Sequence, residues 1–80
     1  MTIGEAVRKR ILDLCRENGI TINRLSIQSG VTQSTVNNIV SGRNNSATVS
    51  TVKKLCDGLG ITIQDFFDSD VFDDLEQEIK

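Results

Sequence analysis

Apolar and polar positions along this chain repeat a short pattern that predicts the starts of helices. The pattern is an apolar residue, a threonine, three further residues and a second apolar residue, and it occurs at 20–25, 31–36, 47–52 and 61–66. Threonine suits the N-cap of a helix, because its hydroxyl accepts a hydrogen bond from a backbone amide of the first turn. The two apolar residues can pack on each other as a hydrophobic staple, so the pattern predicts four helix starts.

Glycines mark where the helices should end, because a left-handed residue commonly follows the last turn. The glycines that follow stretches of helical spacing are Gly19, Gly30, Gly42 and either Gly58 or Gly60. The expected helices cover about 3–18, 22–29, 33–41, 49–58 and 63–68. A sixth segment, DVFDDLEQEI at 70–79, predicts a short acidic helix with an apolar face made of Val71, Phe72, Leu75 and Ile79.

The helical spacing covers nearly the whole chain and leaves no strand-like alternation, which predicts an all-α fold. Eighty residues suit one domain, expected over 1–69, with an acidic amphipathic extension over 70–80. No apolar run approaches the roughly 18 residues of a membrane span. The start of the chain also lacks the layout of a signal peptide, so we expect a cytoplasmic protein with no membrane partner.

The residue types argue against an enzyme. There is no histidine, so the chain has no Ser-His or Cys-His pair and no ordinary general base near neutral pH. Cys15 and Cys56 fit neither a zinc-site spacing nor a CxxC pair, and buried thiols are expected. A redox sensor would require their Cα atoms to lie within about 7 Å. We therefore expect no catalytic residue, metal or cofactor, and no small-molecule ligand is evident.

Charge is spread unevenly along the chain. Residues 1–54 contain eight basic and three acidic residues, whereas 55–80 contain one basic and eight acidic residues, which together give the net charge of −2. Binding to nucleic acid depends on the local field rather than on the total charge. The basic part can therefore face phosphates although the whole chain is acidic.

Between the second and third expected helices, the short joint QSGVTQ at 28–33 predicts a helix-turn-helix. In the third helix, Val36, Ile39 and Val40 share one stripe. The opposite face is uncharged and carries Ser34, Asn37, Asn38 and Ser41, flanked by Gln33 and Thr35. Amide side chains can pair with adenine and threonine methyls can contact thymine, so this face is a candidate for reading bases. The alternative is an ordinary solvated helix face.

With these motifs the chain resembles the lambda-repressor-like family of Cro and XRE helix-turn-helix regulators. The resemblance spans about 3–68 and is most specific in NGITINRLSIQSGVTQSTVNNIVSG and TVSTVKKLCDGLGITIQDFF. It implies a five-helix DNA-binding domain that usually acts as a dimer on palindromic operators. The base-contacting positions are then Thr32, Gln33, Ser34, Asn37 and Asn38. The phosphate-contacting positions are Thr21, Thr35, Arg43, Asn44, Asn45 and Ser46.

The chain departs from this family at three positions. Ile22 stands where many relatives carry a glutamine that supports the third helix and a phosphate. Cys15 and Val40 stand where many relatives carry an Arg–Glu pair. An apolar contact in place of a buried ion pair can be neutral or stabilising, because no charge is desolvated.

Two functions from different classes are compatible with the sequence. The first is a sequence-specific regulator of transcription, a repressor that binds double-stranded DNA as a homodimer. The second is an antitoxin-like interaction module that binds a protein partner through its acidic end. The apolar stripe of that end either dimerises or packs back on Phe66 and Leu59 of its own chain.

Overall fold

Five α-helices and one 3₁₀-helix make up the regular structure of the described residues, 1–42 and 47–79, in the computed structural model. They are α1 (Ile3–Asn18), α2 (Ile22–Ser29), α3 (Gln33–Val40), α4 (Val49–Leu59), α5 (Ile63–Phe67) and a 3₁₀-helix (Asp70–Phe72). No strand occurs in these two ranges, so the predicted all-α class is confirmed. None of these helices combines the length and the apolar character that a membrane crossing requires.

Each predicted threonine cap is present. The hydroxyls of Thr21, Thr32, Thr48 and Thr62 each accept a hydrogen bond from the backbone amide three residues later. Thr2 caps α1 in the same way, and the carboxylate of Glu5 accepts a hydrogen bond from the Thr2 amide in return. That bond lowers the pKa of Glu5. The helix starts therefore follow from local sequence.

The end of α4 decides between the two candidate glycines. Gly60 is the left-handed cap, with φ of 72°, whereas Gly58 lies inside the helix. A Cβ built on Gly58 would lie 2.8 Å from the Cα of Ser29. Gly58 is therefore required by the close approach of α2 to α4 rather than by a turn.

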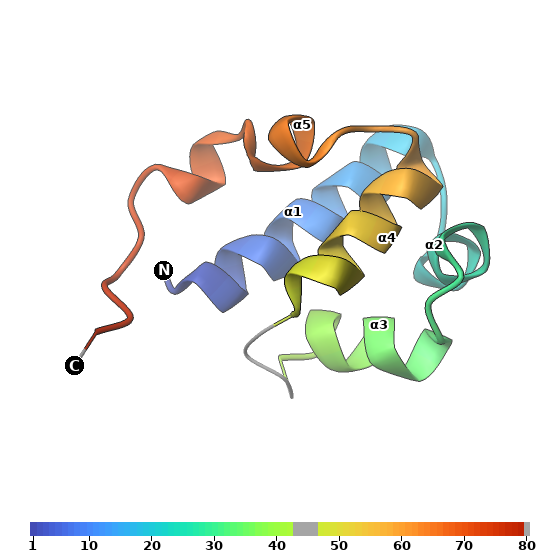
Figure 1. Ribbon diagram of the computed structural model, residues 1–80, viewed down its shortest axis with the longest axis horizontal. Helices are drawn as coiled ribbons and strands as arrows, with labels where there is room; N and C mark the ends of the chain where they lie inside the picture. The colour runs from blue at the N-terminus through green and yellow to red at the C-terminus, as the bar shows by residue number, and fades with distance from the viewer. Residues whose placement is uncertain (43–46, 80) are drawn as a thin grey trace.

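Side chains from every α-helix form the core. Its largest fully buried members are Phe66, Ile11, Leu25, Leu55, Val36 and Cys56. In Figure 1, α1 and α4 run side by side through the middle, with α3 below them, α5 above them and α2 at one end. This arrangement leaves the outer side of α3 uncovered by the other helices.

The structure contradicts the prediction of an acidic helix over 70–79. Only Asp70–Phe72 form a 3₁₀-helix, and residues 73–79 have no regular structure. Asp70, Asp73 and Asp74 would lie three and four residues apart on a helix, where like charges repel. Aspartate is also a weak helix former, and a segment of this length is too short to form a helix without packing.

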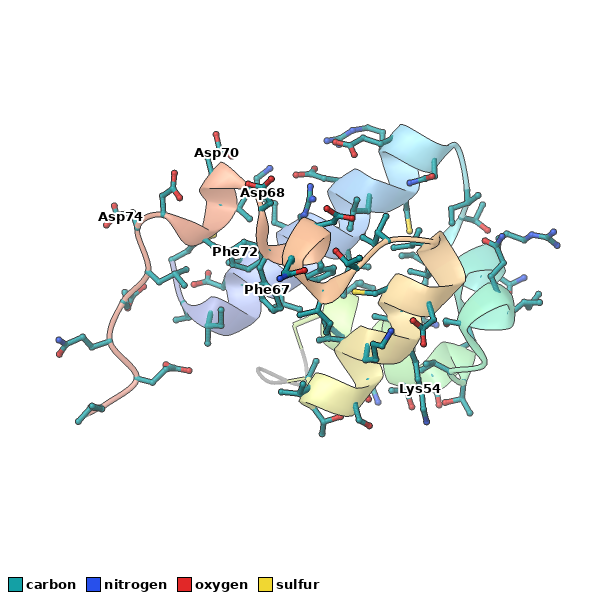
Figure 2. The ribbon with its side chains drawn as sticks, turned by 45° about the horizontal axis from the view of Figure 1, so that its top comes forward. Lys54, Phe67, Asp68, Asp70, Phe72 and Asp74 are labelled. Carbon is teal, nitrogen blue, oxygen red and sulfur yellow. The ribbon has the colours of Figure 1, made fainter. Side chains whose placement is uncertain are left out.

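One apolar side chain of this C-terminal segment, Phe72, packs back on the core of its own chain. The ring centroid of Phe72 lies 4.9 Å from that of Phe67 and 6.2 Å from that of Phe66. Figure 2 shows Phe67 and Phe72 next to each other, while Asp70 and Asp74 point outward. Further along, the Glu76 amide donates to the Met1 carbonyl at 3.1 Å. The sequence left two roles open for the apolar stripe, dimerisation and packing within its own chain. Phe72 adopts the second role, because it packs on Phe66.

Both cysteines are free thiols in the apolar core, with 5% of Cys15 and 0% of Cys56 exposed. Burial raises the pKa of each thiol. Because the thiolate is the reactive form, a raised pKa makes both residues poor nucleophiles at neutral pH. This is the buried role that the sequence predicted.

Cys15→Ser is expected to destabilise the domain by about 1–3 kcal/mol, because it buries a hydroxyl among apolar side chains. Urea denaturation measures the loss, and Cys15→Ala, which buries no hydroxyl, serves as the control. Mild oxidation of the parent protein should leave unchanged the DNA binding that the family resemblance implies. A reversible loss of binding on oxidation that Cys15→Ser abolishes would contradict the core role and support the redox sensor.

Candidate nucleic-acid interface

The joint between α2 and α3 consists of Gly30 and Val31 before the cap of α3. Gly30 ends α2 in the left-handed conformation, with φ of 70°. Val31 then packs on the core, as does Val36 one turn into α3. These two apolar residues flank the Thr32 cap at the spacing of a hydrophobic staple, which fixes the angle at which the chain enters α3. The joint thus has the short connection of a helix-turn-helix.

The two faces of α3 differ as the sequence predicted. Val36 is 0% and Ile39 4% exposed, and Val40 packs against the core from its edge. The exposed side chains are Gln33, Ser34, Thr35, Asn37, Asn38 and Ser41. No hydrogen bond ties the amides of Gln33, Asn37 or Asn38 to another described residue. Within the described ranges, the donors and acceptors of these three amides are therefore unoccupied.

The two threonines at the start of α3 are already hydrogen-bonded. Thr32 accepts a hydrogen bond from the Thr35 amide at 3.3 Å, and the two hydroxyl oxygens lie 2.8 Å apart. Thr32 therefore holds the start of the helix in addition to any contact that it makes with DNA. Both residues are exposed, so their methyl groups remain accessible.

Thr21 lies at the start of α2, where its hydroxyl accepts a hydrogen bond from the Arg24 amide at 3.0 Å. Neither α2 nor α3 has an acidic residue in its first turn, whereas α1 has Glu5 and α5 has Asp65. The N-terminus of a helix carries partial positive charge and unpaired amides, which favour an anion. Within the helix-turn-helix both N-termini keep this positive potential.

Several basic side chains that could face phosphates are bound within the domain. Arg8 donates to the Val40 carbonyl, and Arg10 donates to the Phe66 and Asp65 carbonyls. Ion pairs join Lys9 and Arg16 to Asp13, and Lys53 to Asp57. The hydrogen bond to Asp57 raises the pKa of Lys53. Among the described residues, Arg24 and Lys54 form no ion pair and are free to meet a phosphate.

The remaining expected phosphate contacts lie outside the described residues. These are Arg43, Asn44, Asn45 and Ser46, which follow Gly42 in the connection between α3 and α4. Their assignment stays a prediction. The described candidates, from Thr21 at the start of α2 to Asn38 in α3, all belong to the helix-turn-helix and its caps.

A separate hollow occurs where the starts of α1 and α4 meet α5. It is an open apolar groove of about 190 Å³ lined by Ile3, Val7, Ala47, Val49, Val52, Ile63 and Phe67. Small-molecule sites are usually larger, about 300–1,000 Å³, and include a few placed polar groups. All seven lining residues are apolar, so the groove lacks the polar groups that orient such a ligand.

Comparison with known proteins agrees with this geometry. Residues 10–70 match the model of the Cro/C1-type HTH DNA-binding domain. The chain belongs to the Cro/C1-type helix-turn-helix family. The crystal structure of prophage Lp1 protein 11 is similar to this Cro/C1-type domain, with 40% sequence identity and a TM-score of 0.78. That similarity covers 86% of this chain and 91% of the other. No curated protein matches the sequence significantly.

The departures from the family are accommodated in the core of this Cro/C1-type domain. Ile22, which replaces a glutamine, is half-buried and packs against the core. Cys15 is part of the core and Val40 packs against it, so apolar side chains occupy both positions of the usual ion pair. Removing a buried ion pair in this way avoids its desolvation.

The sequence did not predict the roles of Arg8 and Arg10. Both belong to the basic part of the chain, residues 1–54, whose charge indicates that it can face phosphates. In the structure their guanidinium groups bind backbone carbonyls 32, 55 and 56 residues away. No local spacing signals such a contact, because the partner is a main-chain oxygen of a distant helix. The only hint is a basic residue placed to reach the C-terminus of another helix, where cations are favourable.

Proposed function

We propose that this Cro/C1-type domain is a sequence-specific transcriptional repressor. It places α3 in the major groove of double-stranded DNA and binds a palindromic operator as a homodimer. The observation that carries the proposal is the uncharged face of α3, whose amides are exposed and have no partner among the described residues. Charged side chains bind phosphate at any sequence, whereas amides distinguish bases.

The proposed contacts divide into two groups by chemistry. Base edges meet the side chains that occupy the start and the outer face of α3, which are Thr32, Gln33, Ser34, Asn37 and Asn38. Phosphates meet the N-terminus of α2, the first turn of α3 and the residues that follow α3, which are Thr21, Thr35, Arg43, Asn44, Asn45 and Ser46. The first group supplies specificity, and the second supplies affinity that depends on salt.

The position of the acidic segment supports this orientation. In Figure 1 the 3₁₀-helix and α5 lie on the opposite side of α1 and α4 from α3. Phosphates repel the carboxylates of Asp70, Asp73 and Asp74. With α3 toward DNA, these residues are directed away from it, so the acidic end does not oppose binding. The proposed activity takes place in the cytoplasm, where such a regulator meets its DNA.

Selection of bound duplexes from a random pool tests the proposal with the full chain. The expected product is an inverted repeat whose half-sites lie about one helical turn, or roughly 34 Å, apart. The protein should bind that duplex about a thousand-fold or more tightly than a shuffled duplex at physiological salt. Sedimentation of the complex should give two protein chains per duplex.

Two other results would exclude parts of the proposal. If the pool yields no preferred sequence, base reading by α3 is refuted, and the antitoxin-like alternative, in which the acidic end binds a protein partner, gains support. If the pool yields a single half-site bound by one chain, the homodimer and the palindromic operator are refuted while base reading stands.

A further inference from the structure

α3 ends differently from the helices on either side of it. The caps that follow α2 and α4 are left-handed glycines, whereas Ser41 after α3 has φ of −83° and ψ of −10°, in the right-handed region. The last four carbonyls of a helix have no partner within it. In α3 the left-handed glycine comes one residue later, at Gly42 with φ of 81°, so Ser41, Gly42 or another part of the chain must bind these carbonyls.

Three of the four carbonyls are bound by the residues that follow. The Ser41 amide donates to the Asn37 carbonyl at 2.8 Å, and the Ser41 hydroxyl donates to the Asn38 carbonyl at 3.3 Å. The Gly42 amide donates to the Ile39 carbonyl at 3.4 Å. Two of these three bonds are long for a good hydrogen bond, so the local cap of α3 is weak.

The fourth carbonyl, that of Val40, accepts its hydrogen bond from another helix. The Nε of Arg8 in α1 donates to it at 2.5 Å across a separation of 32 residues. Among the described residues this is the only hydrogen bond between α1 and α3. A guanidinium at the C-terminus of a helix also opposes the negative end of the helix dipole, and a hydrogen bond from a charged donor is stronger than a neutral one.

We infer that Arg8 is a positioning residue for DNA recognition, an inference that rests on the proposed role of α3. Arg8 holds the last turn of α3 against α1 and thereby orients Asn37 and Asn38, which lie in that turn, without touching DNA itself. Recognition of a base edge tolerates an error of only about 0.5 Å, so a loosened last turn loses specificity. The hydrogen bond from Arg8 ends on the backbone carbonyl of Val40. The side chain of Val40 stands where many relatives carry one member of an ion pair.

The chain offers two matched controls on the same helix. Arg10 caps α5 instead of α3, donating to the Phe66 carbonyl at 2.7 Å and to the Asp65 carbonyl at 2.8 Å. Arg10→Gln therefore removes the same charge and also uncaps a helix, but on the side of the domain away from α3. Lys9→Gln removes a neighbouring charge that pairs with Asp13 and caps no helix.

The test compares Arg8→Gln with these two controls at a temperature where circular dichroism shows every variant to be folded. Binding is measured on the duplex that the parent selects from a random pool and on a shuffled duplex, at several salt concentrations. Arg8→Gln should lower the ratio of specific to shuffled affinity about tenfold, because it removes one hydrogen bond from a charged donor. The controls should leave that ratio within about twofold, and Arg8→Lys, which can donate to the same carbonyl, should recover most of it.

Amide hydrogen exchange in the DNA-free protein gives a second measurement that does not depend on the DNA-binding proposal. The Ser41 amide closes the last turn of α3, so it should exchange several-fold faster in Arg8→Gln than in Arg10→Gln. Equal exchange rates and an unchanged affinity ratio in Arg8→Gln would overturn the inference. So would an equal loss on both duplexes with a salt slope lower by about one, the signature of a direct phosphate contact. A parent that selects no sequence would instead refute the proposed function.

Discussion

Gly58→Ala is expected to destabilise the domain by about 1–3 kcal/mol, although alanine favours a helix over glycine by about 1 kcal/mol. The added Cβ would lie 2.8 Å from the Cα and Cβ of Ser29 and 2.9 Å from its backbone nitrogen. Backbone atoms cannot rotate out of the way as the end of a long side chain can. Relief of the overlap therefore requires α2 to move away from α4, the helix on which it packs most extensively.

Chemical denaturation of Gly58→Ala measures this loss, with Lys54→Ala as the control. Lys54 is exposed in the same helix, as Figure 2 shows, so its replacement should change stability by less than about 0.5 kcal/mol. Because α2 is the first helix of the helix-turn-helix, Gly58→Ala should also weaken specific DNA binding under conditions where it is folded. A stability equal to or higher than that of the parent would show that the two helices are not in close contact.

Helix starts could be predicted from this sequence because they depend on neighbouring residues. The threonine caps the helix, and the apolar residue before it packs on a second apolar residue in the first turns of the helix. All four predicted caps are present. The end of α4 was ambiguous between Gly58 and Gly60. Only the packing of α2 resolves it, since Gly58 is required by a residue 29 positions earlier in the chain.

The C-terminal segment was misread because its apolar spacing suits a helix while its charges do not. Phe72 contacts Phe66 and Phe67 from a single 3₁₀ turn, and the chain then runs past Met1 without regular structure. Ile79 is 86% exposed, so the far end of the predicted stripe contributes nothing to the core. Repulsion among closely spaced carboxylates outweighs the periodic pattern, because no packed surface is available along the whole segment to offset it.

The exposed face of α3 could be predicted from the sequence, but which basic side chains remain free to bind phosphate could not. Periodicity alone assigns Val36 and Ile39 to the core and Asn37 and Asn38 to the surface, and their exposures agree. The partners of Arg8 and Arg10 depend on how distant helices meet. The count of basic residues in the first two-thirds of the chain therefore overstates the charge available to phosphates, and the structure reassigns part of it to holding α3 and α5.

Alanine at both Gln33 and Asn37 is expected to give the largest loss of specific affinity. Both side chains are exposed on α3, uncharged and without a hydrogen-bond partner among the described residues. Each substitution should cost about 1–3 kcal/mol on the selected duplex and relax preference at one base pair, because an amide that pairs with a base edge has no replacement. The double variant should approach the affinity of the parent for shuffled DNA, with a salt slope close to that of the parent.

Arg43→Ala and Gln64→Ala make this result interpretable. Arg43, outside the described residues, is expected on the phosphate backbone, so its replacement should weaken the selected and shuffled duplexes alike and lower the salt slope by about one. Gln64 is an exposed amide on α5, on the side away from α3, and its replacement should change neither affinity. Titrations of all the variants on both duplexes at several salt concentrations separate the roles. Because bases are read only where an amide meets a base edge, equal losses on both duplexes for Gln33→Ala and Asn37→Ala would refute base reading by these residues.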